Sequence, residues 1–246
     1  MSDEIVLFDL PSKGRCACWS LNPWKARAAL NFKFIPYRTE WVEYPDLKPT
    51  LQALGVPPND SDVNPFYEYS SPAARFPDGT YVMDSLKIAR QLEKLQPEPS
   101  LHLDSGYVET TQNAVTALWD ALRPLATVRV PEKLLNPPSA EYFHRTRAER
   151  SGMPLAELAK SDKAKSTWRN AEIPLNSIKK ILHEHDDGPY VMGKQASFAD
   201  LILAGFWRFM QKLDDHGDLT GRIMGWDPSL EAHQQACEQW LQRDDH

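Results

Sequence analysis

One segment divides the chain into two unlike parts: residues 96–106, with the sequence QPEPSLHLDSG. Its prolines and glycine end the helical periodicity that precedes it, and almost all of the later sequence has the spacing of amphipathic helices. Before this segment, short apolar runs alternate with a helical pattern, which is typical of an α/β domain. We therefore predict an α/β domain over residues 1–96 and an all-helical domain over residues 107–246.

The first part predicts a strand–helix–strand unit that is followed by a hairpin and a helix. Residues 5–10, IVLFDL, form a continuous apolar run and indicate a buried strand. Residues 34–42 indicate a second strand, parallel to the first because a helix over residues 23–33 connects them. A Pro-Asp-Gly turn lies within residues 73–83 and predicts the hairpin, and apolar residues over 86–95 recur at helical spacing.

Proline interrupts both parts of the chain. Residues 46–66 are rich in proline, so we expect an irregular insert with at most one short helix over residues 47–54. Pro174 lies inside a predicted helix of the second part and should kink or shorten it. The helices predicted for the second part cover residues 108–128, 139–150, 162–184, 197–213 and 229–243.

The charge balance excludes several classes of partner. The chain carries 28 Lys and Arg residues against 34 Asp and Glu residues, a net charge of −6. A nucleic-acid site and a basic membrane-binding surface are therefore not expected. No window approaches 18 uninterrupted apolar residues, so no membrane span is expected either. The expected ligand is a small molecule.

The cysteines and the first residues predict a cytoplasmic protein. Cys16, Cys18 and Cys237 are an odd number without the spacing of a disulfide framework. Residues 1–10 lack the features of a secretory signal. Residues 183–187, HEHDD, could suggest a metal site, but we expect a solvated helix end and no bound metal.

The stretch with the most chemistry lies at residues 16–27, CACWSLNPWKAR. Asn22 is a strong N-cap residue and Pro23 suits the first helical position, so a helix is expected to begin there. Ser20 then lies two residues before the helix, where its hydroxyl can donate to a thiolate that the helix dipole also favours. Asn22 offers a second donor. A mixed disulfide formed by Cys16 or Cys18 is the alternative.

Two further dipeptides would suit an extended peptide ligand. A cis bond at Ser71-Pro72 would turn the backbone N–H and C=O of Ser71 outward, whereas a trans proline would simply begin an edge strand. Asp84-Ser85 precedes the helix over residues 86–95, where a hydroxyl and backbone N–H groups can bind a carboxylate and Asp84 can meet an ammonium group. Alone, this dipeptide is an ordinary helix cap.

In this order, the three motifs resemble the site of cytosolic glutathione transferases, and the resemblance extends over essentially the whole chain. Ser197-Phe198-Ala199-Asp200 is similar to the N-capping box in the core helix of that family. The segments SLNPWKARAALNFK, PDGTYVMDSLKIARQLE and YFHRTRAERSGMPLAEL are most similar to fungal-specific class A transferases, which are related to bacterial β-etherases. The resemblance implies a thioredoxin-like N-terminal domain, an all-α helical C-terminal domain, glutathione as cosubstrate and a homodimer.

The resemblance also implies roles for individual residues. Ser20 would be the catalytic serine, assisted by Asn22. The residues implied in glutathione binding are Ser71, Pro72, Asp84 and Ser85.

The resemblance implies a detoxification enzyme that transfers glutathione to aromatic electrophiles or aryl ethers, with peroxidase as a side activity. It further implies polyphenol binding, for which Trp119 and Trp168 are candidate stacking residues. One alternative is a ligand-binding protein that sequesters aromatic compounds without turnover. A scaffold or regulator without a working glutathione site is the other.

Overall fold

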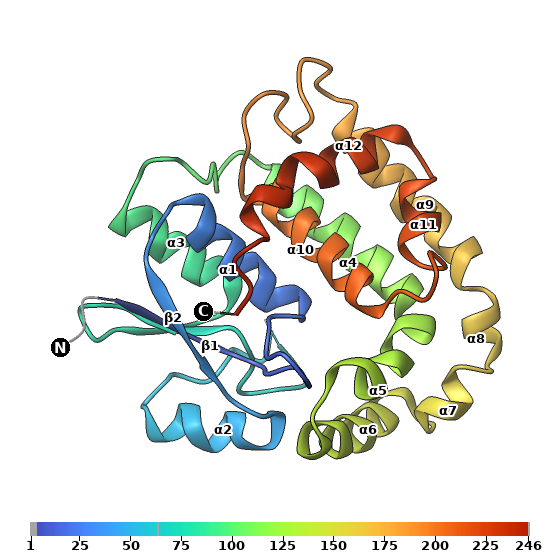
Figure 1. The fold of residues 1–246 in the computed structure, drawn as a ribbon, viewed down its shortest axis with the longest axis horizontal. Coiled ribbons are helices and arrows are strands. Elements are labelled where there is room, and N and C mark those ends of the chain that lie inside the picture. Colours follow the sequence, from blue (N-terminus) through green and yellow to red (C-terminus); the bar gives the residue numbers. More distant parts are fainter. Residues whose placement is uncertain (1–3, 63, 246) are drawn as a thin grey trace.

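A four-stranded mixed sheet forms the centre of the N-terminal domain (Figure 1). The computed structural model describes residues 4–62 and 64–245, so residues 1–3, 63 and 246 of the predicted domains lie outside the described residues. Strand β1 is parallel to β2, and β3 is antiparallel to both β1 and β4, which confirms the predicted parallel pair and hairpin. In the spatial order β2-β1-β3-β4, the strands are β2 Tyr37–Trp41, β1 Ile5–Asp9, β3 Ala73–Arg75 and β4 Tyr81–Met83.

Helices cover both faces of this sheet, which explains the uninterrupted apolar sequence of β1. Successive side chains of a strand point to opposite faces. Val6 and Phe8 therefore pack in one cluster with α2, Tyr44–Ala53, whereas Ile5 and Leu7 pack in the larger core with the other two helices. Those two helices are α1 Leu21–Phe32 and α3 Ser85–Leu95. The short helix predicted in the proline-rich insert is thus present as α2, but it begins earlier.

The C-terminal domain consists of helices, as predicted. The segment predicted as one helix over residues 162–184 is divided at Ser166, not at Pro174, and α9 continues through the proline. Packing of the buried face of α9 against α4 outweighs the backbone hydrogen bond that proline removes. The helices are α4 Tyr107–Ala126, α5 Val130–Leu134, α6 Pro137–Ser151, α7 Leu155–Leu158, α8 Asp162–Lys165, α9 Thr167–Leu182, α10 Phe198–Leu213, α11 Thr220–Met224 and α12 Pro228–Cys237.

Helix α10 forms the centre of the molecule and connects the two domains. It contacts α4 and α12 in its own domain and α1 of the N-terminal domain. The predicted capping box is confirmed. The Ser197 side chain accepts from the backbone N–H of Asp200, and the Asp200 side chain accepts from the backbone N–H of Ser197. Within the described residues, no helix has the length and apolar character that crossing a membrane requires.

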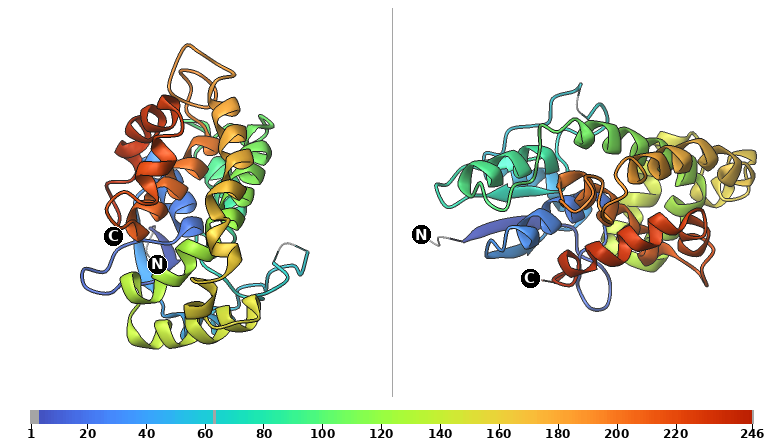
Figure 2. Two further views of the ribbon diagram at one scale, coloured as in Figure 1. Left: turned by 90° about the vertical axis from the view of Figure 1, so that its right-hand side faces the viewer. Right: turned by 90° about the horizontal axis from the view of Figure 1, so that it is seen from above.

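The C-terminal residues return to the N-terminal domain, as both views of Figure 2 show. The Cys18 N–H donates to the carbonyl oxygen of Asp244 at 2.7 Å, and the Arg243 guanidinium donates to the carbonyl oxygen of Tyr37 at 2.8 Å. These bonds join the last residues to the loop before α1 and to β2. The loop that leads to Ser20 is therefore fixed in part by residues near the C-terminus.

Candidate active site

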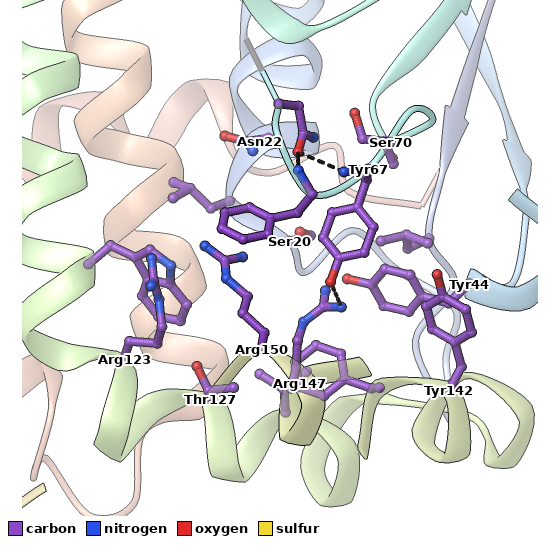
Figure 3. A pocket seen from close by; sticks show the side chains of 18 of the residues that line it. Ser20, Asn22, Tyr44, Tyr67, Ser70, Arg123, Thr127, Tyr142, Arg147 and Arg150 are labelled. Carbon is purple, nitrogen blue, oxygen red and sulfur yellow. Dashed lines mark hydrogen bonds between the residues drawn. The ribbon is translucent and has the colours of Figure 1, made fainter. Parts of the chain in front are cut away.

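A cleft of about 1050 Å³ lies where the ends of α1 and β1 meet α4 and α6 (Figure 3). A smaller pocket of about 120 Å³ adjoins it, and the two share the lining residues Asn22, Asn64, Ser70 and Ser71. The smaller pocket is almost entirely polar in its lining residues, whereas the larger one also has many aromatic rings. The arrangement suits a ligand with a polar part and an adjacent aromatic partner.

Ser20 lines the larger cleft directly at the N-terminus of α1. The helix begins at Leu21 with Ser20 as its N-cap residue, so the prediction that it begins at Asn22-Pro23 is wrong. The Trp24 N–H donates to the Ser20 carbonyl oxygen at 3.1 Å, and Pro23 is accommodated because N–H groups of a first turn lack helical partners. The Ser20 side chain makes no cap bond, so its hydroxyl remains available to a ligand at the positive end of the helix dipole.

The Ser71-Pro72 bond is cis, which is the alternative that suits an extended peptide ligand. The Ser71 hydroxyl donates to the carbonyl oxygen of Phe8 at 3.1 Å, which ties this loop to the end of β1. Among the described residues, no loop or turn hydrogen bond uses the backbone N–H or C=O of Ser71. Both groups remain available to an extended ligand beside Ser20.

Asp84 lines the smaller pocket and caps α3. Its Oδ1 atom accepts hydrogen bonds from the N–H groups of Leu86 and Lys87, at 2.9 and 3.1 Å. Both cap bonds use one oxygen, so Oδ2 can meet a cationic group of a ligand. Ser85 is buried and lines neither pocket, although it was predicted beside Asp84 as a contact residue.

Comparison with known proteins identifies the family. The sequence pattern described as glutathione S-transferase, C-terminal domain, matches residues 110–240, and that of the N-terminal domain matches residues 19–95. The glutathione S-transferase-like protein ustS of Aspergillus flavus is 30% identical, in an alignment that covers 93% of this chain and 87% of the relative. The chain belongs to the glutathione S-transferase family.

Solved structures of glutathione transferases share the fold over almost the whole chain. A glutathione S-transferase of Ceriporiopsis subvermispora, solved in complex with glutathione, has a TM-score of 0.84 and 29% identity, with 96% of this chain and 97% of that chain covered. Glutathione transferase GSTFuA3 from Phanerochaete chrysosporium also has a TM-score of 0.84 and 29% identity, with 98% of each chain covered.

The two N-terminal cysteines of this glutathione S-transferase are poorly placed for thiol chemistry. Cys18 is completely buried, Cys16 is half-buried, and neither lines the two pockets. Burial raises the pKa of the Cys16 thiol and raises that of Cys18 well above its ordinary value, which disfavours the reactive thiolate. The structure therefore does not support a mixed disulfide at these residues.

The two tryptophans proposed for ligand stacking lie in different places. Trp119 lines the cleft and packs against Phe209, with ring centroids 5.2 Å apart. Trp168 lies outside the cleft, where the Arg222 guanidinium stands 4.3 Å from its ring centroid. The expectation that Trp168 faces the cleft is therefore corrected, because α9 turns this side chain toward α11.

The histidine-rich segment after α9 forms ordinary surface hydrogen bonds. His183 bonds to Asp227 at 2.9 Å, and Glu184 accepts from the Tyr107 hydroxyl at 3.0 Å. Among the residues that the structure describes, no group of three or more His, Cys, Asp or Glu side chains could hold a metal ion.

Sequence reasoning missed the residues that enclose the aromatic side of the cleft. On α6, Arg147 lies four residues after Phe143, and Arg150 lies three residues after Arg147, so all three lie on one helical face. This spacing was a usable signal within the segment YFHRTRAER. Further missed lining residues come from α2, from residues 59–70 and from α6: Tyr44, Asn59, Asn64, Phe66, Tyr67, Ser70 and Tyr142.

Proposed function

We propose that the chain is a serine-type glutathione transferase in which Ser20 stabilises the thiolate of glutathione. The observation that carries the proposal is the position of Ser20, which is the N-cap residue of α1 and lines the cleft. Its hydroxyl makes no cap bond and is therefore free to bind a ligand. A thiolate beside this hydroxyl would gain a hydrogen bond and the favourable field of the helix N-terminus. Asn22, also in the lining, would supply a second donor.

The rest of glutathione would extend from Ser20 into the smaller pocket. The backbone N–H and C=O of Ser71 would pair with the cysteinyl unit beside the cis Pro72. The Asp84 Oδ2 atom would accept from the γ-glutamyl ammonium group. The Ser85 side chain is buried and lines neither pocket, so only its backbone N–H, the first of α3, would donate to the α-carboxylate.

Catalysis would consist of ionising and positioning the thiol. At pH 7 a thiol of pKa about 8.5 is only about 3% ionised, and lowering this pKa by about two units, which takes about 2.7 kcal/mol, makes most of it thiolate. The thiolate then attacks the electrophilic carbon, a C–S bond forms, and the leaving group departs with the electron pair of the broken bond. Ser20 donates its hydrogen bond throughout and does not ionise.

The finer assignment follows the resemblance to fungal-specific class A transferases and β-etherases. It includes aryl ethers among the electrophiles, a peroxidase side activity and a role in detoxification. We further propose a cytoplasmic homodimer with domains over residues 1–96 and 107–246. The similarity to GSTFuA3 and the free thiols of the described cysteines support this assignment.

A ligand-binding protein that sequesters polyphenols is the second candidate. The aromatic lining of the cleft favours it, since Trp119, Tyr44 and Tyr142 offer flat apolar surfaces in a large volume. Tight displacement of a bound fluorescent dye by polyphenols, together with turnover close to the uncatalysed rate, would support this candidate. Rapid turnover would reject it.

The decisive experiment is the pH titration of bound glutathione, followed by thiolate absorbance in the ultraviolet. The wild type should show a bound-thiol pKa of about 6 to 7, and Ser20→Ala should raise it by at least about one unit. Ser20→Thr, which keeps the hydroxyl, should restore much of the depression. Cys16→Ser serves as the control for the protein's own thiol and should leave the titration unchanged. An identical titration in Ser20→Ala would remove Ser20 from the mechanism.

A further inference from the structure

The charge of the cleft differs in sign from that of the whole chain. The chain has a net charge of −6. The charged residues that line the cleft are mainly basic: Lys48, Arg123, Arg147, Arg150 and Lys163, with Asp120 as the acidic member. Arginine and lysine side chains gathered on one concave surface favour an anionic ligand.

Arg147 reaches into this cleft with neutral partners. Its guanidinium donates to the hydroxyl of Tyr67 at 2.6 Å and to that of Thr146 at 2.9 Å. It stands 4.4 Å from the centroid of the Phe143 ring and 5.5 Å from that of Tyr44. Among the described residues, no ion pair neutralises its charge. The rings and hydroxyls instead hold the guanidinium in place at the cleft.

Arg150 lies one helical turn further along α6 and is also without a carboxylate partner in the described part of the chain. Its guanidinium stands 4.0 Å from the centroid of the Phe66 ring, which is itself 57% exposed. Partial burial, followed by repulsion from Arg123, lowers the pKa of Arg150, and Arg147 also contributes. Like charges held close together repel one another, and a bound anion would relieve this repulsion.

The third arginine comes from the other wall of the cleft. Arg123, on α4, is paired with Asp120 and lies beside the Trp119 ring, whose centroid is 5.9 Å away. Figure 3 shows the side chains of Arg123, Arg147 and Arg150 extending into the same cleft opposite Ser20. Aromatic rings therefore alternate with guanidinium groups on the side of the cleft that faces the proposed thiolate.

We propose that the electrophile taken by this transferase is an aromatic carboxylate, whose carboxylate is bound by Arg147 and Arg150 while its ring packs among Tyr44, Phe66 and Trp119. The proposal rests on the proposed function and specifies its second substrate. Guanidinium groups suit this task because their planar donors match a carboxylate in two parallel hydrogen bonds. The carboxylate binds and orients the substrate and takes no part in bond exchange.

The reaction of a suitable probe is a simple displacement. The glutathione thiolate attacks the chlorine-bearing carbon of 4-chloro-3,5-dinitrobenzoate, a C–S bond forms, and chloride leaves with the electrons of the C–Cl bond. The methyl ester of the same compound reacts in the same way but lacks the negative charge. The ratio of kcat/KM for the acid to kcat/KM for the ester therefore reports recognition of the carboxylate.

The test compares this ratio between variants. Arg150→Gln and Arg147→Gln should each lower it at least tenfold, while Arg150→Lys should retain part of the preference. The matched control is Arg145→Gln, because Arg145 lies on the same helix, is 61% exposed, pairs with Glu149 and does not line the cleft. The control should leave the ratio unchanged. Unchanged ratios in both Arg147→Gln and Arg150→Gln would overturn the proposal.

A binding measurement keeps the result independent of turnover. Calorimetry can compare S-methylglutathione with the glutathione conjugates of the acid and of the ester, all prepared chemically. The expected result is selective loss of affinity for the acid conjugate in Arg147→Gln and Arg150→Gln. Equal losses for all three ligands would overturn the proposal, because the arginines would then bind a carboxylate of glutathione itself. Selective loss without turnover would retain carboxylate recognition and reject the proposed catalysis.

Discussion

Lys25 is a charge that the fold buries close to the proposed glutathione site. Its ammonium group donates to the side-chain oxygen of Gln112 at 2.7 Å, across the boundary between α1 and α4. Burial lowers the pKa of Lys25 from its ordinary value of 10.5 to about 8, although the negative charge of Asp84 acts in the opposite direction. Folding therefore favours the neutral amine relative to the unfolded chain, although the ammonium form still predominates below about pH 8.

This lowered pKa predicts a pH dependence of stability. Between pH 8 and pH 10.5 the unfolded chain binds more protons at Lys25 than the folded chain does, so the free energy of unfolding should rise with pH in this interval. Below about pH 8 the full penalty of burying the charge applies. In Lys25→Met this contribution is absent. Urea unfolding from pH 7 to 10.5 should show the wild type gaining stability relative to the variant, and parallel curves would contradict the prediction.

Asp200 connects the start of helix α10 to the surrounding helical domain. Its buried carboxylate accepts hydrogen bonds from the Val191 N–H at 2.7 Å and from the Ser197 N–H and hydroxyl at 2.7 and 2.9 Å. His233 lies 3.2 Å from the same carboxylate, and its other ring nitrogen accepts from the Trp207 indole N–H at 3.2 Å. The cap of one helix thus also holds α12 and the loop before α10.

Removing this carboxylate should destabilise the protein more than removing an ordinary helix cap. Asp200→Ala leaves two buried backbone N–H groups and His233 without their acceptor, so we expect a loss of about 3 kcal/mol or more in the free energy of unfolding. Ser197→Ala removes the cap hydroxyl alone and should cost about 1 kcal/mol. Chemical denaturation of both variants measures the difference. Equal losses would show that Asp200 acts as a helix cap only.

For the whole molecule, the relation between the two domains depends on close contact of α1 with α10. A Cβ atom at Gly205 on α10 would lie 3.0 Å from the Cβ of Trp24 and 3.4 Å from the carbonyl oxygen of Leu21. Trp24 is fully buried, so it has little room to move. Because Ser20 is the N-cap residue of α1, this contact also positions the proposed thiolate-binding hydroxyl.

Gly205→Ala should therefore separate α1 from α10 and cost about 1 to 3 kcal/mol in the free energy of unfolding. Glutathione affinity should fall at the same time, because the start of α1 moves. Gly221→Ala is the matched control, since a Cβ there meets nothing within 4 Å, and it should stabilise α11 by about 0.4 to 1 kcal/mol. Thermal unfolding and glutathione titration of both variants test this. A Gly205→Ala protein as stable as Gly221→Ala would contradict it.

Several features of this fold are encoded in short stretches of the sequence and can be predicted from them. Hydrophobic spacing predicted the strands and hairpin and the change to helices after residue 96. The Ser197–Asp200 capping box and the Asp84 cap were also predictable, because their partners lie within three residues. Motif order further placed Ser20 and Ser71 in one site, and the structure brings both residues to one cleft.

Other features depend on residues that are distant in the sequence, so they follow from packing between elements. Helix α1 begins at Leu21 although Asn22-Pro23 is a favourable local start, and Cys18 is excluded from chemistry because the fold buries it. Trp119 and Trp168 are both half-buried helix residues, yet one lines the cleft and the other packs beneath Arg222. Facing positions on different helices are set by packing between elements, which the local sequence does not specify.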